Sequence, residues 1–300
     1  MKLRTLILAL AMGPIATPAW AGAQQGGREL EGVIDLHVHA DPAASSRGRR
    51  SVNVFEAAEL ARRHGMRAMV IKNHYTETAS QAYLVSQIVP GIEVYGGIVL
   101  NRAVGGINPV AVENMATITG GLGRIVWLPT FDSENNAPDG DNVPITGNGA
   151  LLPEVDAVLE VMGRYDLALA TGHVAPEEGL LAIRAARAAG IDRIIVTHPA
   201  SGAVGMSLEL QKEAASLGAL LEYTILSVMG GRGSLDDFAT QIREVGPENV
   251  VITSDLGQSG NPSHADGMRT IIRQLQAAGF SEAEVDLMIE RNPARLLGID

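Results

Sequence analysis

Short apolar runs alternate with segments of helical period along most of this sequence. The runs are almost continuously apolar, which is typical of strands that are covered by helices. Eight such runs lie near residues 32–38, 67–73, 92–100, 124–130, 167–172, 192–198, 219–223 and 249–254. Eight segments with apolar residues at helical spacing lie at 54–64, 80–89, 109–119, 153–165, 176–189, 208–217, 235–245 and 264–278. We therefore expect eight strands, each followed by a helix.

Eight alternating strands and helices are the number expected of a parallel (β/α)8 barrel of TIM type. A doubly wound open sheet gives the same alternation, so the pattern alone does not separate the two folds. The first, fifth, sixth and eighth runs each end in a residue that can bind metal. Closure brings these ends around one mouth, whereas an open sheet spreads them along an edge. We therefore predict an α/β protein with a single TIM-type barrel.

The residues at these strand ends are His37, His39, His173, His198 and Asp255. Residues two apart on a strand face the same side, so His37 and His39 should both point into the mouth. Two imidazoles can share one ion, at Zn–N distances of about 2.0–2.1 Å. Asp255 could also be a helix N-cap, but the next helical segment begins several residues later. The pattern thus indicates a metal site, with Asp255 able to bind metal or accept a proton.

Composition narrows the classes of ligand and partner. The formal charge is −11, and an acidic protein lacks the basic surface that a nucleic-acid partner requires. The charge says little about the small-molecule substrate that we expect. Cysteine is absent, which excludes disulfides and thiolate ligands. Any metal must therefore be held by imidazole, carboxylate or lysine-derived groups.

The first residues have the features of an export signal. Lys2 and Arg4 provide positive charge, an apolar stretch follows, and small residues allow cleavage near Ala21. A membrane anchor is disfavoured because glycine and proline interrupt a stretch that is already short for a bilayer span. The mature protein is therefore expected to be soluble, without a membrane partner, and secreted or periplasmic. The expected division is a signal peptide at 1–21, a flexible leader at 22–30 and one barrel domain at 31–300.

The whole arrangement resembles the amidohydrolase superfamily, the metal-dependent hydrolases built on a (β/α)8 barrel. The motifs that carry the resemblance are Ile34-Asp35-Leu36-His37-Val38-His39, His173, His198 and Asp255. The C-terminal segment 291–298 is similar to the closing helix of that family, so we expect an extra helix there. The resemblance implies that the five strand-end residues are ligands or catalytic groups. It also implies hydrolysis of an amide, ester, lactone or phosphoester bond.

One departure from the family concerns the bridging ligand of binuclear members, a carboxylated lysine or a glutamate at the end of strand four. The fourth run here, 124–130, has no such residue, and the nearest candidates are Lys72 and His74 at the end of the second run. Their spacing places both inward. Lys72 could be carboxylated and bridge two metals, stay an ammonium that orients a substrate anion, or form a salt bridge to Glu222 or Asp255. One and two metal ions are both open.

Asn101, Arg47 and Glu222 are weaker candidates, as substrate-binding residues. Asn101 follows the third strand, Arg47 lies in the loop after the first, and Glu222 has an inward option on the seventh. An arginine there could bind a carboxylate or a phosphate, although structural hydrogen bonding or a solvated position is the simpler alternative for all three. The polar segment 129–149 follows the fourth strand and is either a lid over the mouth or a surface insertion.

The expected function is a metal-dependent hydrolase. The residues expected to hold a divalent metal, zinc in the first place, are His37, His39, His173 and Asp255. His198 would be a ligand of a second ion or an electrophile, and Asp255 would move the proton between water and leaving group. Lys72 or His198 would help to stabilise the oxyanion. A mononuclear metal-dependent decarboxylase or lyase and a non-catalytic metal-binding barrel are the alternatives.

Overall fold

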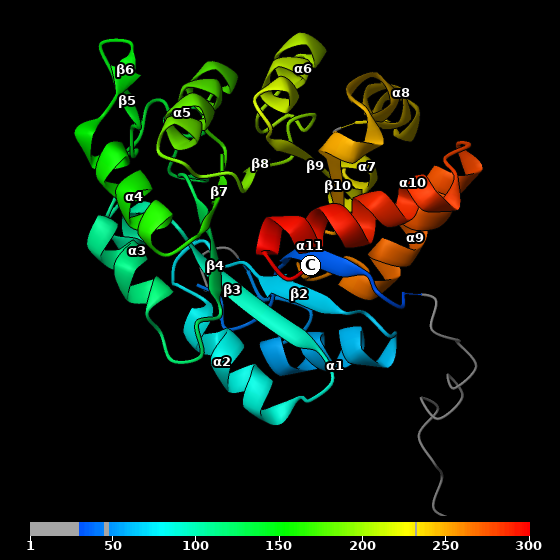
Figure 1. Cartoon of the computed structure of the whole chain (residues 1–300). Coiled ribbons are helices and arrows are strands. Elements are labelled where there is room, and N and C mark those ends of the chain that lie inside the picture. Colours follow the sequence, from blue (N-terminus) through cyan, green and yellow to red (C-terminus); the bar gives the residue numbers. More distant parts are fainter. Residues whose placement is uncertain (1–29, 45–47, 232) are drawn as a thin grey trace, which may run out of the picture.

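The computed structural model describes residues 30–44, 48–231 and 233–300. Within them, eight parallel strands form one sheet in the order β1-β2-β3-β4-β7-β8-β9-β10 (Figure 1). These strands are β1 (Ile34–Val38), β2 (Ala68–Ile71), β3 (Glu93–Val99), β4 (Gly123–Trp127), β7 (Ala168–Ala170), β8 (Ile194–Val196), β9 (Leu220–Thr224) and β10 (Val250–Thr253). All eight predicted strands are therefore present.

The sheet curves until its first and last strands meet. The Asp255 N–H donates to the His37 carbonyl at 2.9 Å, and the His39 N–H donates to the Leu256 carbonyl at 2.8 Å. Val38 and Leu256 form a parallel bridge at the same place. These contacts close the barrel, so the prediction of a TIM-type α/β fold is confirmed and the open sheet is excluded.

Helices surround the strands, and all eight predicted ones are present with small shifts at their ends (Figure 1). Polar N-cap residues explain where several helices begin. The Asn53 side chain, for example, accepts hydrogen bonds from the N–H groups of Phe55 and Glu56. The helices that follow the strands are α1 (Val54–Arg63), α2 (Ala79–Ile88), α3 (Pro109–Ala116), α4 (Pro153–Arg164), α5 (Pro176–Ala188), α6 (Leu208–Ser216), α8 (Leu235–Val245) and α9 (His264–Ala277).

Additional elements occupy the two ends of the barrel. After β4, the segment 129–149 runs into a short antiparallel pair, β5 (Thr146–Gly147) with β6 (Ala150–Leu151), and α7 (Ile225–Met229) follows β9 directly. The C-terminus forms α10 (Glu282–Asp286), a π-helical turn (Leu287–Arg291) and α11 (Asn292–Leu297). The expected closing helix is therefore present.

The closing helix α11 covers the amino ends of the strands. Asn292 donates from its side chain to the carbonyl of Val250, the first residue of β10. Leu296 and Leu297 are buried in the same apolar cluster as the inward-facing strand residues. Since α11 fills this end with apolar side chains, the polar strand ends at the opposite mouth are left to form a site.

Two sequence predictions fall partly or wholly outside the described residues. They are the signal peptide and leader up to residue 29, and Arg47. Among the residues that are described, none belongs to a helix with the length and apolar character needed to cross a bilayer.

Candidate metal and substrate site

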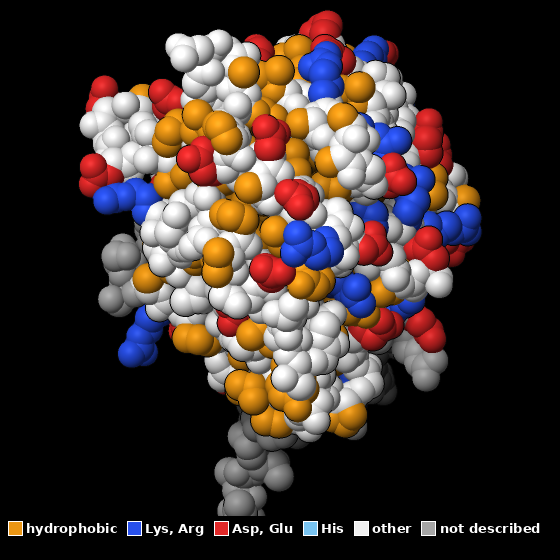
Figure 2. All heavy atoms as spheres, turned by 60° about the vertical axis from the view of Figure 1, so that its left-hand side comes forward, with side chains coloured by type: hydrophobic (Ala, Val, Ile, Leu, Met, Phe, Trp, Pro, Cys, Tyr) orange, Lys and Arg blue, Asp and Glu red, His pale blue; other side chains and the backbone are white. Residues whose placement is uncertain are grey.

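A cavity of about 200 Å³ lies at the carboxyl ends of the strands. Five of the seven histidines line it, and the face drawn in Figure 2, where acidic, basic and apolar side chains are interspersed, shows none of them. Phe131 and Leu226 supply an apolar part of the wall. The polar residues that line the cavity include His37, His39, Arg50, Lys72, His74, His173, His198 and Asp255.

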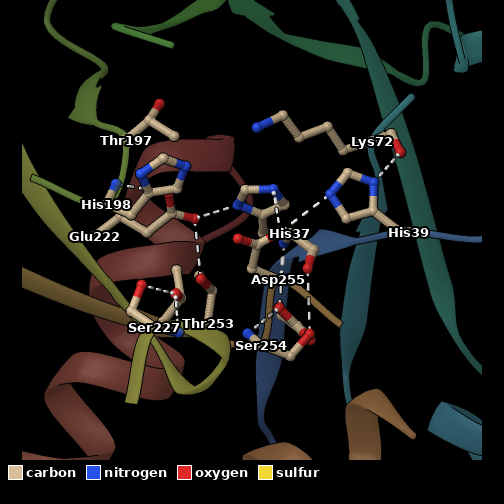
Figure 3. A network of polar contacts seen from close by, with 12 residues as sticks. His37, His39, Lys72, Thr197, His198, Glu222, Ser227, Thr253, Ser254 and Asp255 are labelled. Atoms are coloured by element: carbon tan, nitrogen blue, oxygen red, sulfur yellow. Dashed lines mark hydrogen bonds and ion pairs between the residues drawn. The ribbon is translucent and has the colours of Figure 1, made fainter. Parts of the chain in front are cut away.

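His37, His39 and Asp255 form the most compact group in this cavity (Figure 3). The Nε2 atoms of His37 and His39 each lie 3.1 Å from Asp255 Oδ1. Of the residues that the structure describes, only these three offer metal-ligating atoms that all lie within 4.8 Å of one another. Strand alternation turns both histidines to the mouth, while Val38 between them packs toward the helices.

Acceptors behind the two histidines determine which ring nitrogens face Asp255. His37 Nδ1 donates to Glu222 Oε1 at 3.0 Å, and His39 Nδ1 donates to the Lys72 carbonyl at 3.0 Å. A carboxylate and a carbonyl can only accept, so each Nδ1 carries a proton. In its neutral form, each ring therefore turns the lone pair of Nε2 to the Asp255 carboxylate. This is the arrangement in which metal-ligating histidines are held by an outer acceptor.

The charges of this group fit a cation between its three atoms. Burial lowers the pKa of His37, but Asp255 and Glu222 outweigh this and raise it to about 9. Burial lowers the pKa of His39 to about 4. For Asp255, burial raises the pKa, but His37 and His39 lower it by more, so the pKa of Asp255 lies well below the usual range. Two lone pairs facing a carboxylate oxygen repel it unless a positive charge lies between them. A proton on His37 provides that charge in the metal-free protein, and a divalent metal suits the same imidazole and carboxylate donors.

Glu222 lies behind His37 rather than on the cavity wall. Its Oε1 also accepts from Thr253 Oγ1 at 2.9 Å, and its Oε2 accepts from the His198 N–H at 3.2 Å. Burial raises its pKa, but His37 outweighs this and holds it at about 2. The carboxylate therefore connects β9 to three neighbouring strand ends, and the structure gives it a positioning role instead of the predicted contact with substrate.

Glu222→Gln is expected to weaken zinc binding by about 10–100-fold. The donors on His37, Thr253 and His198 all point at the carboxylate, so one of them would meet an amide N–H in the variant. Competition with a chelating dye measures the affinity. Glu244→Gln, which changes a half-exposed residue of α8, is the matched control. Equal zinc affinity in the wild type and in Glu222→Gln would refute this positioning role.

Asp35 is a positioning residue that sequence reasoning did not single out. Its Oδ1 accepts the backbone N–H groups of His37 at 3.1 Å and Ser254 at 3.0 Å, which ties β1 to β10. Burial raises its pKa to about 6. Gly257 lies at the same junction of β1 and β10. Its φ of +128° and its close approach to the His39 carbonyl require glycine, since a Cβ would have no room. A buried acidic residue inside an apolar run was the signal that could have identified Asp35.

The other three histidines line the cavity outside the compact group, and each has its Nδ1 held by a neutral side chain. His74 contacts Thr130 Oγ1 at 2.8 Å, His173 contacts Asn136 Nδ2 at 2.7 Å, and His198 contacts Ser201 Oγ at 2.8 Å. Burial lowers the pKa of all three rings, that of His198 to about 4. These rings are therefore neutral near pH 7.

Lys72 is buried at the same cavity with an unpaired ammonium group. It is 1 % exposed, and its Nζ has no hydrogen-bond partner in the part of the chain that is described. The ammonium lies 5.2 Å from the centre of the Trp127 ring. None of the ion pairs found among the described residues joins it to Glu222 or Asp255, so the salt-bridge alternative is not seen. Burial lowers the pKa of Lys72.

Of the remaining sequence candidates, Asn101 does not line the cavity, and Arg47 lies outside the described residues. Asn101 is fully buried, and its side chain contacts the His74 carbonyl, Thr130 and Asp132. Arg50, in the loop after β1, lines the cavity. Phe131, a lone aromatic residue in the polar segment after β4, lines it too.

Comparison with known proteins gives a family and a fold. Residues 32–222 match the model of a family described as a family of unknown function, DUF6282. A search of curated proteins finds no match.

Three solved structures with a similar fold have low sequence identity to this chain. An amidohydrolase from Pseudomonas aeruginosa has a TM-score of 0.62 at 14% identity, covering 90% of this chain and 96% of its own. An organophosphorus hydrolase from Deinococcus radiodurans has a TM-score of 0.57 at 16% identity, covering 81% and 82%. A 2,6-dihydroxybenzoate decarboxylase has a TM-score of 0.56 at 11% identity, covering 89% and 99%. The resemblance to the amidohydrolase superfamily is thus confirmed at the level of the fold.

Proposed function

The chain belongs to the family of unknown function DUF6282, and from its cavity we propose that it is a metal-dependent hydrolase of a small substrate. The observation that carries the proposal is the convergence of two imidazole Nε2 atoms on one carboxylate oxygen at 3.1 Å, with both Nδ1 atoms held from behind. An enzyme of this fold places its reacting groups at the same mouth.

His37, His39 and Asp255 would hold the metal. A divalent ion there, with zinc best suited to imidazole and carboxylate ligands, would supply an activated water and polarise the bond to be cleaved. Asp255 remains a carboxylate because its histidine neighbours hold its pKa well below the usual range, despite burial. It can therefore accept a proton from the attacking water and deliver it to the leaving group.

Other residues that line the cavity would orient the substrate. The His198 ring lies 6.1 Å from that of His37, centre to centre, and lines the cavity, where it can hold the scissile carbonyl or phosphoryl oxygen. Phe131 and Leu226 add apolar surface to the cavity wall and would limit the number of water molecules around the reacting group. A cavity of about 200 Å³ restricts the substrate, or the part that reacts, to a small group.

The proposal is tested by loading the protein with zinc and assaying it against small amides, esters, lactones and phosphoesters. Zinc-dependent release of acid, amine or phosphate that a chelator abolishes would support a hydrolase. A protein that binds no divalent metal, or one that binds zinc without turning over any of these classes, would count against it.

A mononuclear decarboxylase is the second candidate, and the two buried or half-buried cations of the cavity favour it. Lys72 and Arg50 both line the cavity and would suit a carboxylated substrate. The fold is also shared with a 2,6-dihydroxybenzoate decarboxylase. Carbon dioxide released from aromatic or aliphatic acids, without a second organic product, would identify this reaction in the same assays.

A further inference from the structure

Lys72, His74 and His173 line the cavity outside the compact group of His37, His39 and Asp255. Strand ends that carry histidine beside a lysine suit either a second metal ion or a substrate anion. The two possibilities require opposite proton positions on the imidazole rings, because a metal needs a free Nε2 lone pair and an anion needs an Nε2–H. The hydrogen bonds behind the rings distinguish them.

The His173 ring accepts a hydrogen bond from the loop after β4. Asn136 Nδ2 lies 2.7 Å from His173 Nδ1 and 3.3 Å from the Thr130 carbonyl. The carbonyl only accepts, so the amide nitrogen, not the amide oxygen, occupies this position. His173 Nδ1 therefore accepts a hydrogen bond, and the ring proton must be on Nε2, the only other ring nitrogen.

His74 is in the same state because of a buried threonine. Thr130 Oγ1 accepts from Asn101 Nδ2 at 2.9 Å and lies 2.8 Å from His74 Nδ1. The Asn101 amide is oriented by the backbone, since its oxygen accepts the Thr130 N–H and its nitrogen donates to the His74 carbonyl. Thr130 is fully buried, so its hydroxyl proton has His74 Nδ1 as its acceptor. His74 thus also carries its proton on Nε2.

Lys72 adds a third donor. Its ammonium is buried, has no hydrogen-bond partner in the described chain and offers three N–H groups. A buried ammonium without a partner is costly, so a ligand with anionic oxygens would satisfy it. Because none of the three groups offers an acceptor, they form what we call the donor wall: Lys72, His74 and His173.

We propose that the donor wall binds an oxyanion of the substrate, a carboxylate or phosphoryl group, and that it does not hold a second metal ion. This inference rests on the proposed function only in taking the cavity as the place where substrate binds. It assigns the protein to small acidic substrates and a mononuclear site, with Lys72 kept as an ammonium. The family-based expectation of a metal on His173 is replaced by a hydrogen-bond donor.

Nitrogen-15 NMR of labelled histidine rings, in metal-free and zinc-loaded protein, tests the proton positions. His74 and His173 are expected to show Nε2–H in both states, and acetate or inorganic phosphate should shift these two signals. Acetamide, the neutral analogue of acetate, is the matched control and should not shift them. Protonated Nδ1 atoms on these rings, or ring signals that change to those of metal ligands on zinc loading, would overturn the proposal.

Lys72→Met tests the anion site separately. The variant should bind one zinc per chain as the wild type does, but its affinity for acetate or phosphate should fall at least about tenfold. The sequence has three lysines, so Lys212→Met on the surface of α6 is a matched control and a carbon-13 carbamate signal is readily assigned. A carbamate on Lys72, or a second zinc lost with Lys72, would refute the donor wall and leave the hydrolase proposal standing.

Asn136→Asp reverses the hydrogen bond to His173. A carboxylate accepts where the amide donated, so the His173 proton should move to Nδ1 and acetate binding should weaken. Zinc at the compact group should be unaffected. An unchanged His173 spectrum in this variant would overturn the assignment of its ring. Absence of zinc from the wild type would instead refute the proposed function, while the ring spectra and anion titrations of the metal-free protein still decide the inference.

Discussion

Asp255→Asn is expected to lower turnover by roughly 10²–10⁴-fold while much of the zinc stays bound. The asparagine oxygen can still face His37 and His39, whose Nε2 atoms lie 3.1 Å from Asp255 Oδ1, so part of the ligand set survives. A neutral amide cannot accept the proton of the attacking water or return it to the leaving group. The kcat of zinc-loaded wild type and variant, compared at equal zinc content, measures this effect.

Asp266→Asn provides the control for this substitution, because it changes an aspartate at the start of α9, outside the residues that line the cavity. It should retain near-normal turnover. If Asp255→Asn also retains near-normal turnover with zinc bound, Asp255 is a ligand only and the proton is moved by another group. If the variant loses its zinc entirely, turnover must be compared after reconstitution at saturating zinc.

The fold was predictable because apolar pattern and strand-end chemistry point to the same architecture. Each strand of the barrel is buried on both faces, so continuous apolar runs located even strands as short as β7 (Ala168–Ala170). The metal-ligating residue types at the strand ends were the reason to predict that the barrel closes. The hydrogen bond from His39 to Leu256, which joins β1 to the segment after β10, confirms this closure. The short α7 (Ile225–Met229) was missed because it follows β9 directly and is too short to show a helical period in the sequence.

The site was predictable as far as strand ends determine it. His37, His39 and Asp255 meet because each ends a strand of a closed barrel. The role of Glu222 was not predictable, since a strand position that faces inward can lie behind a ligand as well as beside a substrate. The proton position on His173 depends on Asn136, a loop residue 37 positions away, and no local pattern encodes that contact.

His37→Ala is expected to abolish tight zinc binding. It removes one of three groups whose ligating atoms lie within 4.8 Å of one another, and two ligands do not hold zinc tightly. Zinc at 100 times its Kd stabilises a protein by about 2.7 kcal/mol. At about 2–4 °C for each kcal/mol, chelation should lower the thermal midpoint of the wild type by roughly 5–10 °C.

The same chelation should leave the midpoint of His37→Ala unchanged, because that variant starts without zinc. His64→Ala is the matched control, since His64 lies at the end of α1 outside the cavity and contacts Arg269. The thermal midpoint of this variant should fall on chelation as that of the wild type does. A wild-type midpoint that chelation does not change, in protein shown to contain zinc, would mean that the metal is bound somewhere other than on the folded site.

Zinc affinity is also expected to depend on pH in a defined direction. Asp255 and Glu222 raise the pKa of His37 to about 9 in the metal-free protein, against the effect of burial. Below that pH the ion must displace this proton, so affinity should rise with pH, by about tenfold per unit for one proton, and level off near pH 9. The rise in affinity comes from the metal-free protein: as the pH increases, His37 loses the proton that competes with zinc for its Nε2 lone pair. Chelator competition at pH 6, 7 and 8 measures it, and an affinity that is constant over this range would show that His37 is already neutral before zinc binds.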